Sequence, residues 1–356
     1  MNQPALPTDA CIILTYRCQM RCQMCNIWQH PTDIEKEITA DELQMLPGGF
    51  EFINLTGGEP FLRDDLEDII RVLSPKTKRI VVSTSGYHYE KILRIVPQFT
   101  NVGVRVSIEG LSQKNDELRG RTGGFDRGMK TLLGLQKLGF KDIGFGITVS
   151  NNNSGDMLWL YELSRSMGLE FATATFHNSY YFHKDDNQIT NIDKVCDDFR
   201  KLAHFQMKEN KPKSWFRALF NLGLIRYINQ EKRMLPCEAG TTNFFIDPYG
   251  DVYPCNGLEE KYWKESMGNI RNVQNFEEIW NSPKASAVRE KVATCPKNCW
   301  MVGTASPVMH KYVKKVAPWI IKNKIKSLLG KSISMSAPFI DVRQDSRQGN
   351  LRQSEK

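Results

Sequence analysis

The chain has 356 residues, of which 40% are hydrophobic and 25% charged, as is usual for a folded globular protein. No run of 18 apolar residues occurs and the first residues lack a basic stretch followed by an apolar one, which predicts a cytoplasmic protein without a membrane-spanning helix. The net charge of +8 lies at one end. Residues 308–356 carry eleven Lys or Arg against three Asp or Glu, a net +8, so residues 1–307 sum to zero.

The first half of the chain alternates apolar, β-branched runs with amphipathic helical patterns, which is typical of βα units around a parallel sheet. The pattern predicts strands at residues 11–16, 52–56, 80–84, 102–108, 143–149 and 171–176. It predicts helices at residues 40–46, 66–73, 89–96, 125–138 and 156–167, and two more at about 193–210 and 215–230. Thr39 and Glu42 form a capping-box pattern for the first helix.

Three cysteines follow the first predicted strand with the spacing C-x3-C-x2-C: Cys18, Cys22 and Cys25. Nine cysteines in a chain without an export signal favour metal or cluster ligands over disulfides. Three thiolates can hold an iron–sulfur cluster and leave one iron open for a ligand. The alternative is a zinc site completed by a distant fourth ligand.

Other candidate binding residues follow the later strands. Two glycines in Gly57-Gly58-Glu59-Pro60 would let the backbone approach a ligand closely, and Glu59 could accept from an amino group. Hydroxyl and guanidinium groups could bind a ribose or a carboxylate, and Arg suits a carboxylate because its planar fork binds both oxygens. Ordinary turn or barrel positions are the alternative for several of these side chains. The candidates are Ser83, Ser107, Arg119 and Val149.

A second cysteine set occurs later, near a hairpin signal at residues 247–250. Four thiolates are enough for a fully ligated [4Fe–4S] cluster, and they also suit structural zinc. These cysteines are Cys237, Cys255, Cys295 and Cys299. Cys11 and Cys196 stand apart and are expected to be buried thiols.

A basic helix is predicted at residues 308–331, where seven lysines and no acidic residue follow His310. Its apolar face could lie on an anionic membrane surface or dock on the barrel. Pro318 is expected to kink it, with Trp319 at the boundary of the two faces. No nucleic acid is expected, because no recognisable binding module occurs. Residues 332–356 are polar and predicted to be disordered.

The C-x3-C-x2-C spacing and the GGEP sequence in register after it resemble the radical S-adenosylmethionine (radical SAM) superfamily. Met24 departs from the pattern of that family, which usually has an aromatic residue before the third cysteine. The segment around Gly-Asp-Val-Tyr-Pro-Cys255 resembles the SPASM extension, or its shorter Twitch form. The resemblance implies an α/β fold, a partial (β/α)6 barrel followed by a small loop-rich cluster domain and a basic amphipathic tail. The expected division is a tail at 1–10, the barrel with a helical extension at 11–230, the cluster domain at 231–307, the basic helix at 308–331 and the final tail at 332–356.

The resemblance also implies the cofactors. A [4Fe–4S] cluster on Cys18, Cys22 and Cys25 would bind SAM and cleave it reductively to a 5′-deoxyadenosyl radical, which abstracts hydrogen from a substrate carbon. Gly57–Pro60 would contact the methionyl amine, Ser107 and Arg119 the carboxylate, and Val149 the adenine. The four later cysteines would hold one auxiliary [4Fe–4S] cluster for electron transfer or substrate binding. Flavodoxin or ferredoxin is the expected electron donor.

The single auxiliary cluster and the amphipathic tail favour a sugar, glycan or lipid-linked small molecule as substrate, with contact at the inner membrane surface if residues 310–331 bind lipid. A peptide- or protein-modifying maturase is one alternative. A non-catalytic metal-binding scaffold is another, but the complete motifs oppose it. The sequence identifies no catalytic acid or base. The pocket-lining candidates after the sixth strand, otherwise ordinary loop residues, are His177, Asn178, Tyr180 and Tyr181.

Overall fold

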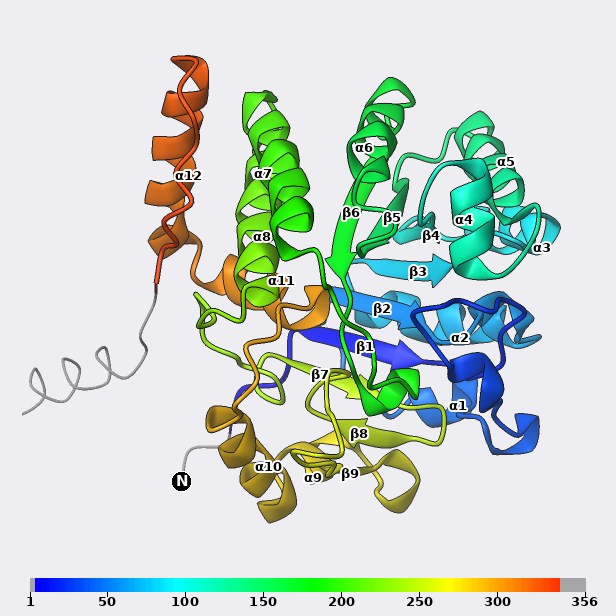
Figure 1. Ribbon diagram of the computed structural model, residues 1–356. Helices are drawn as coiled ribbons and strands as arrows, with labels where there is room; N and C mark the ends of the chain where they lie inside the picture. Colours follow the sequence, from blue (N-terminus) through cyan, green and yellow to red (C-terminus); the bar gives the residue numbers. More distant parts are fainter. Residues whose placement is uncertain (1–3, 340–356) are drawn as a thin grey trace, which may run out of the picture.

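A computed structural model describes residues 4–339. At its centre is one sheet with the strand order β6-β5-β4-β3-β2-β1-β7-β8-β9 (Figure 1). The strands from β1 to β7 pair in parallel, whereas β8 and β9 are antiparallel. The strands are β1 (Asp9–Ile13), β2 (Phe52–Thr56), β3 (Ile80–Thr84), β4 (Val102–Ser107), β5 (Ile143–Val149), β6 (Glu170–Thr175), β7 (Asn243–Ile246), β8 (Asp251–Tyr253) and β9 (Gly268–Asn269).

Helices follow most of the parallel strands and pack against the sheet, as in repeated βα units. The helices are α1 (Ala40–Leu43), α2 (Leu66–Leu73), α3 (Tyr89–Ile95), α4 (Ser112–Arg119), α5 (Gly124–Lys137), α6 (Asp156–Ser166), α7 (Ile192–Lys208), α8 (Pro212–Ile228), α9 (Phe276–Trp280), α10 (Pro283–Ala293), α11 (Val302–Lys311) and α12 (Val313–Leu328). In Figure 1, α7 and α8 stand side by side beyond β6, and α12 lies outside them.

The six predicted strands and the helices between them are confirmed, most of them within two residues of the predicted ends. The largest shifts are of three residues: α1 ends at Leu43 instead of residue 46, and β1 ends at Ile13 instead of residue 16. The chain turns there because the carbonyls of Thr15 and Arg17 accept from Gly58 and Glu59 instead of continuing the ladder. The predicted capping box of α1 is present between Thr39 and Glu42.

The two faces of the sheet differ. One face is covered by helices, and its residues belong to one continuous core. The other face carries half-exposed, mostly small or polar side chains at alternate positions, and we call it the inner face. Because the strands pair in register, these side chains lie on the same side. They include Cys11, Asn54, Thr56, Ser83, Arg105, Ser107, Gly146, Thr148, Ala172 and Ala174.

A strand from the later part of the chain extends this sheet. β7 pairs in parallel with β1, from Asp9 opposite Asn243 to Ile12 opposite Ile246. The predicted turn at residues 247–250 is confirmed as the β7–β8 hairpin, in which Asp247 Oδ1 accepts from the N–H groups of Tyr249 and Asp251. The segments before and after the predicted boundary between residues 230 and 231 therefore contribute strands to the same sheet.

The C-terminal segment packs on the outer helices. α12 contacts α7 and α8 and runs through Pro318 as one helix. Trp319, expected at the boundary of its faces, is buried. Residues 332–339 form no helix or strand, and two hydrogen bonds join them to α12: Ser334 N donates to Asn323 Oδ1 and Trp319 Nε1 donates to Ser336 O. Residues 340–356 lie outside the described residues. Within residues 4–339 no helix has the length and apolar content needed to cross a membrane.

Candidate metal and cofactor site

The first cysteine set lies in the loop that leaves β1 at the carboxyl edge of the sheet. Burial raises the pKa of Cys18 and Cys25 to about 12, and it also raises the pKa of Cys22. A thiolate in such a place is unfavourable unless a cation compensates its charge. The three thiols therefore suit a positively charged iron centre, which binds the thiolate form.

The glycines after β2 allow that loop to touch the cysteine loop. Gly58 N donates to Thr15 O at 2.7 Å and Glu59 N donates to Arg17 O at 2.9 Å. A Cβ atom on Gly58 would lie 2.2 Å from Arg17 O, which is backbone and cannot move aside easily. The GGEP sequence thus holds the cysteine loop at a separation that only glycine permits.

Glu59 joins the ends of β2 and β3. Its buried carboxylate accepts from Phe61 N at 3.2 Å, Thr84 Oγ1 at 2.7 Å and Ser85 N at 2.8 Å, and also from Ser85 Oγ. These donors use the acceptor positions of both oxygens. Glu59 accordingly fixes this edge of the sheet, and backbone carbonyls of the same loop are left as the acceptors for an amino group.

The remaining candidates from the strands occupy different faces. Ser83 lies on the inner face, where its Oγ accepts from Asn54 Nδ2 at 3.0 Å. Ser107 ends β4 on the same face. Val149 is fully buried in the core and points to the opposite face from Thr148. The structure therefore brings Ser83 and Ser107 together on the inner face but leaves Val149 among core residues.

Arg119, at the end of α4, lies between the cysteine loop and the end of β4. Its Nη1 donates to Glu109 Oε1 at 3.2 Å, and its backbone carbonyl accepts from Arg21 N at 2.9 Å. Its Nε is buried and has no hydrogen-bond partner among residues 4–339. Burial opposes the charge of this guanidinium, but the neighbouring Cys22 and Glu109 groups raise its pKa. An unpaired N–H on a buried cation beside the cysteines fits a carboxylate ligand such as that of SAM.

The second cysteine set converges on a separate pocket. Cys237, Cys255, Cys295 and Cys299 line it together with Arg233 and Lys297. A Cβ atom on Gly257 would lie 4.0 Å from both Cys255 Sγ and Cys299 Sγ. Burial raises the pKa of Cys255 and of Cys299. Four thiols, of which Cys299 is buried and the others are half-buried, with two cations beside them suit an anionic cluster held by four thiolates. In the described part of the chain, no three His, Cys, Asp or Glu side chains converge closely enough to hold a single metal ion.

The two other cysteines lie outside both sets. Cys196 is buried on α7, as predicted, where Asn229 Nδ2 lies 3.6 Å from its sulfur. Cys11 differs from the prediction because it is only half-buried, on the inner face, 3.8 Å from Asn54 Oδ1.

The loop after β6 connects the two cysteine sets, and we call residues 177–183 the bridging loop. At one end Lys297, between Cys295 and Cys299, donates to Asn178 O at 3.3 Å. Tyr180 N also donates to Leu258 O at 2.8 Å. The other end of the loop contacts Asn26, which follows Cys25 of the first cysteine set.

Asn26, adjacent to Cys25, donates to two residues of the bridging loop. Its backbone N–H reaches Phe182 O at 2.9 Å and its side chain reaches His183 O at 3.0 Å. Both cysteine sets are thus tied to one short loop.

The pocket-lining candidates lie on this loop, but three of the four are occupied by structural contacts. Tyr181 is buried and donates to Gly57 O at 3.2 Å, and Asn178 pairs with Asn187. Tyr180 packs against the ring of Tyr253. His177 also stacks on Tyr227, and its Nδ1 lies 2.8 Å from Thr175 O, but its buried Nε2 has no partner within residues 4–339.

Sequence reasoning missed a buried ionic network under the first cysteine loop. Glu37 accepts from Arg17 Nε at 3.0 Å and Nη2 at 2.8 Å, and it lies 3.6 Å from Arg63 Nη1. It also accepts from the hydroxyls of Thr15 and Thr32. Arg63 Nη1 donates to Leu14 O at 2.9 Å. No spacing signal in the sequence links these residues, because they come together only through the fold.

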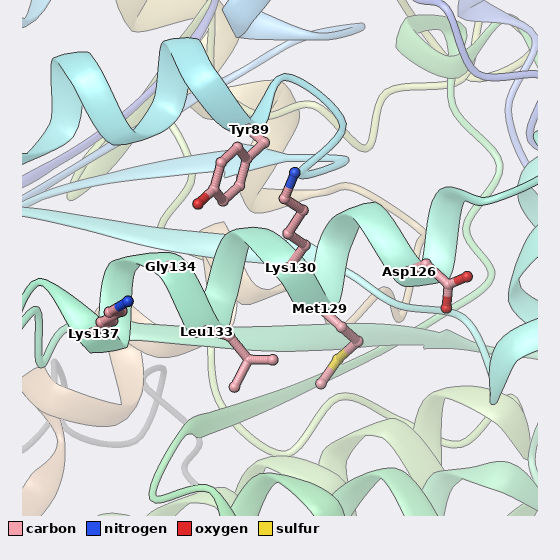
Figure 2. Close-up of a pocket in the computed structure, with 7 residues that line it drawn as sticks. All are labelled: Tyr89, Asp126, Met129, Lys130, Leu133, Gly134 and Lys137. Atoms are coloured by element: carbon pink, nitrogen blue, oxygen red, sulfur yellow. The ribbon is translucent and has the colours of Figure 1, made fainter.

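Another pocket has no cysteine in its lining. It has a volume of about 400 Å³ and lies at the outer surface between α3 and α5 (Figure 2). Its lining includes Tyr89, Met129, Lys130 and Leu133, without a cysteine or any of the predicted binding residues. We assign it no part in the chemistry.

Comparison with known protein families agrees with this arrangement. Residues 12–162 match the radical SAM superfamily, and residues 237–301 match SPASM, an iron–sulfur cluster-binding domain. The first match contains the three-cysteine loop, the GGEP sequence and Arg119. The second contains all four cysteines of the second set.

Similar curated proteins span most of the chain. The antilisterial bacteriocin subtilosin biosynthesis protein AlbA of Bacillus subtilis is 25% identical over 353 residues, which cover 92% of this chain and 74% of AlbA. The AdoMet-dependent heme synthase of Methanosarcina barkeri is 27% identical over 298 residues, covering 76% and 80%. The sporulation killing factor maturation protein SkfB of Bacillus subtilis is 26% identical over 258 residues, covering 70% and 60%.

Among solved structures, SuiB of Streptococcus suis superimposes with a TM-score of 0.61 at 15% identity, over 80% of this chain and 68% of SuiB. The identity is low, so this likeness supports the fold alone. It confirms the α/β architecture expected from the sequence.

Proposed function

Because the chain belongs to the radical SAM superfamily and carries a SPASM domain, we propose that it is an enzyme that modifies a peptide by abstracting hydrogen from one of its carbon atoms. The observation that carries the proposal is the match along 92% of the chain to AlbA, a bacteriocin biosynthesis protein. SkfB, a maturation protein, adds support. These relatives favour the peptide alternative over the sugar, glycan or lipid-linked substrate that the sequence alone favoured.

The cofactors are a [4Fe–4S] cluster that binds SAM, SAM itself and an auxiliary [4Fe–4S] cluster. When bound and reduced, the first cluster with SAM supplies a 5′-deoxyadenosyl radical able to take hydrogen from an unactivated carbon. Cys18, Cys22 and Cys25 would hold this cluster. Arg119 would pair with the SAM carboxylate through its free Nε. We also propose flavodoxin or ferredoxin as the electron donor.

The chain's own residues orient the substrate and exclude water. The small side chains of Gly146, Ala172 and Ala174 leave room on the inner face next to Ser107 and Thr148. The bridging loop passes from that edge of the sheet to the second cysteine set. A substrate on the inner face would therefore have the three-cysteine loop on one side and the bridging loop on another. The ligands of the auxiliary cluster would be the four cysteines of the second set, Cys237, Cys255, Cys295 and Cys299.

A second candidate function is modification of a tetrapyrrole, because the heme synthase of Methanosarcina barkeri matches 76% of the chain. Its substrate is a flat macrocycle rather than an extended chain. The inner face does not distinguish the two substrates by charge, so the choice depends on a direct assay.

The test is deuterium transfer under anaerobic conditions. The protein reconstituted with iron and sulfide receives SAM, dithionite and uniformly deuterated candidate peptides or porphyrins. The proposal expects deuterium in 5′-deoxyadenosine with a peptide only. Transfer from a porphyrin alone would replace it by the second candidate, and failure to cleave SAM at all would reject radical chemistry itself.

A further inference from the structure

We propose that one exposed face of α12 docks on the surface of an anionic lipid bilayer. The polarity of this helix is inverted in its C-terminal half. The side chains that face the protein there include Asn323, Lys324 and Ser327, whereas large apolar side chains face outward. A helix stabilised only by packing on its own protein would place these groups the other way round.

The outward side chains form a stripe, which we call the apolar stripe: Ile321, Ile325 and Leu328. They are 58%, 52% and 71% exposed, and their spacing of four and three residues puts them on one side of the helix. Leu329 lies next to them, 64% exposed. Figure 1 shows α12 outermost on its side of the molecule, with the segment that follows it running back along the helix.

Hydrogen bonds prevent the helix from turning this stripe inward. The buried Lys324 ammonium donates to three carbonyls at the end of α7, those of Met207 at 3.0 Å, Lys208 at 3.3 Å and Glu209 at 2.7 Å. The preceding residue, Asn323, accepts from Ser334 N at 2.6 Å. Rotation of α12 would break these bonds and leave a buried cation unpaired, which is costly. The apolar stripe is therefore a fixed feature of the surface.

The positive charge around the apolar stripe indicates which partner binds there. Residues 311–331 contain seven lysines and no acidic residue. Lys314, Lys322 and Lys331 are exposed and form no ion pair within residues 4–339. An apolar strip bordered by lysines matches a bilayer with anionic headgroups, into which the strip can sink while the ammonium groups stay at the phosphates.

Two other occupants fit less well. A second copy of the chain would bring two lysine-rich helices together, so like charges would face each other. Residues 340–356 offer little apolar surface, because Ile340, Val342 and Leu351 are their only large apolar residues and these are separated by charged and polar side chains. The bilayer is thus the occupant that satisfies both the apolar area and the charge.

The experiment is vesicle flotation of the full chain, anaerobically, with phosphatidylcholine vesicles and with vesicles in which roughly one-third of the lipid is phosphatidylglycerol. We expect binding to the anionic vesicles only. The triple variant Ile321→Ser, Ile325→Ser, Leu328→Ser should bind more than about tenfold less. Each of Lys314→Gln and Lys322→Gln should reduce partitioning by roughly fivefold. The matched control is Leu133→Ser with Leu138→Ser, two exposed leucines on and just after α5, which should leave binding unchanged.

Several outcomes would overturn the inference. They are absence of binding by the full chain, equal binding of the triple variant and the parent, or equal binding to both kinds of vesicle. A dimer in light scattering that the triple variant converts to a monomer, without vesicle binding by either, would assign the stripe to a second copy instead. Unchanged circular dichroism and cluster absorbance of each variant show that the fold is kept.

Discussion

Arg119 donates from Nη1 to Glu109 Oε1 at 3.2 Å, while its buried Nε has no partner in the described part of the chain. Glu109 is itself fixed, because its other oxygen accepts from Thr148 N at 2.7 Å. The pair holds the guanidinium in a single orientation beside Cys18 and Cys22, with one N–H directed elsewhere. This arrangement prepares an anion site without leaving a free buried charge.

The first prediction is that Arg119→Gln weakens SAM binding by about 10- to 100-fold, since a charge-assisted contact to a carboxylate is lost. Arg119→Lys should recover only part of this, because a lysine cannot reproduce the planar fork. The measurement is the SAM dissociation constant of reconstituted protein, followed through the change that SAM causes in the cluster's electron paramagnetic resonance spectrum. Arg121→Gln, an exposed neighbour, serves as the control. Equal SAM affinity in Arg119→Gln and the parent would exclude this role.

The second prediction concerns the network below the cysteine loop. Glu37→Gln removes the carboxylate that faces Arg17 and Arg63, so Arg17 loses its carboxylate partner, whereas Arg63 keeps its ion pair with Asp65. Breaking such a pair costs about 3–5 kcal/mol in unfolding free energy. The measurement is denaturant unfolding at neutral pH, with exposed Glu35→Gln as the control. A loss below about 1 kcal/mol would mean that the network contributes little.

The third prediction is a pH dependence that arises from His177. Burial lowers the pKa of His177 to about 4. The unfolded chain binds the proton more tightly, so this residue's contribution to stability is complete at pH 7.5 and declines as the pH falls below about 6.5. The loss at pH 5 should be about 2 kcal/mol. His177→Phe keeps a ring on Tyr227 but cannot titrate, so unfolding measured at both pH values should show a smaller decline. Equal declines in the two proteins would contradict the assignment.

The elements that could be predicted from the sequence are those set by interactions between neighbouring residues. β2, β3 and β5 were predicted at their observed ends because each is a short apolar run bounded by turn residues. The three-cysteine spacing and the GGEP sequence are also local signals.

The interactions that escaped prediction join distant segments. The pairing of β7 with β1 links residues more than 230 positions apart. The contacts of the bridging loop with Asn26 and Lys297 join residues 157 and 119 positions apart. On α12 the helical period was correct, but which side faces the protein depends on Lys324 and the end of α7, which no pattern within residues 313–328 reveals.

The last prediction tests the contact between the GGEP loop and the cysteine loop. Gly58→Ala would place a methyl group 2.2 Å from Arg17 O and 2.9 Å from Tyr16 O, both backbone atoms. The two loops must then separate, which moves the chain next to Cys18. The auxiliary site is remote from this contact. We therefore expect the variant to lose most of its SAM cleavage while it keeps an auxiliary cluster, so that its iron content falls from about eight to about four per chain.

The control for this variant is Gly48→Ala, because a Cβ atom on Gly48 would meet no atom within 4 Å. It should retain both clusters and full SAM cleavage. The measurements are iron and sulfide analysis of reconstituted protein, together with 5′-deoxyadenosine formed with dithionite. A Gly58→Ala variant that kept about eight irons and full SAM cleavage would contradict this prediction. The tight backbone contact would then not be needed to position the first cluster.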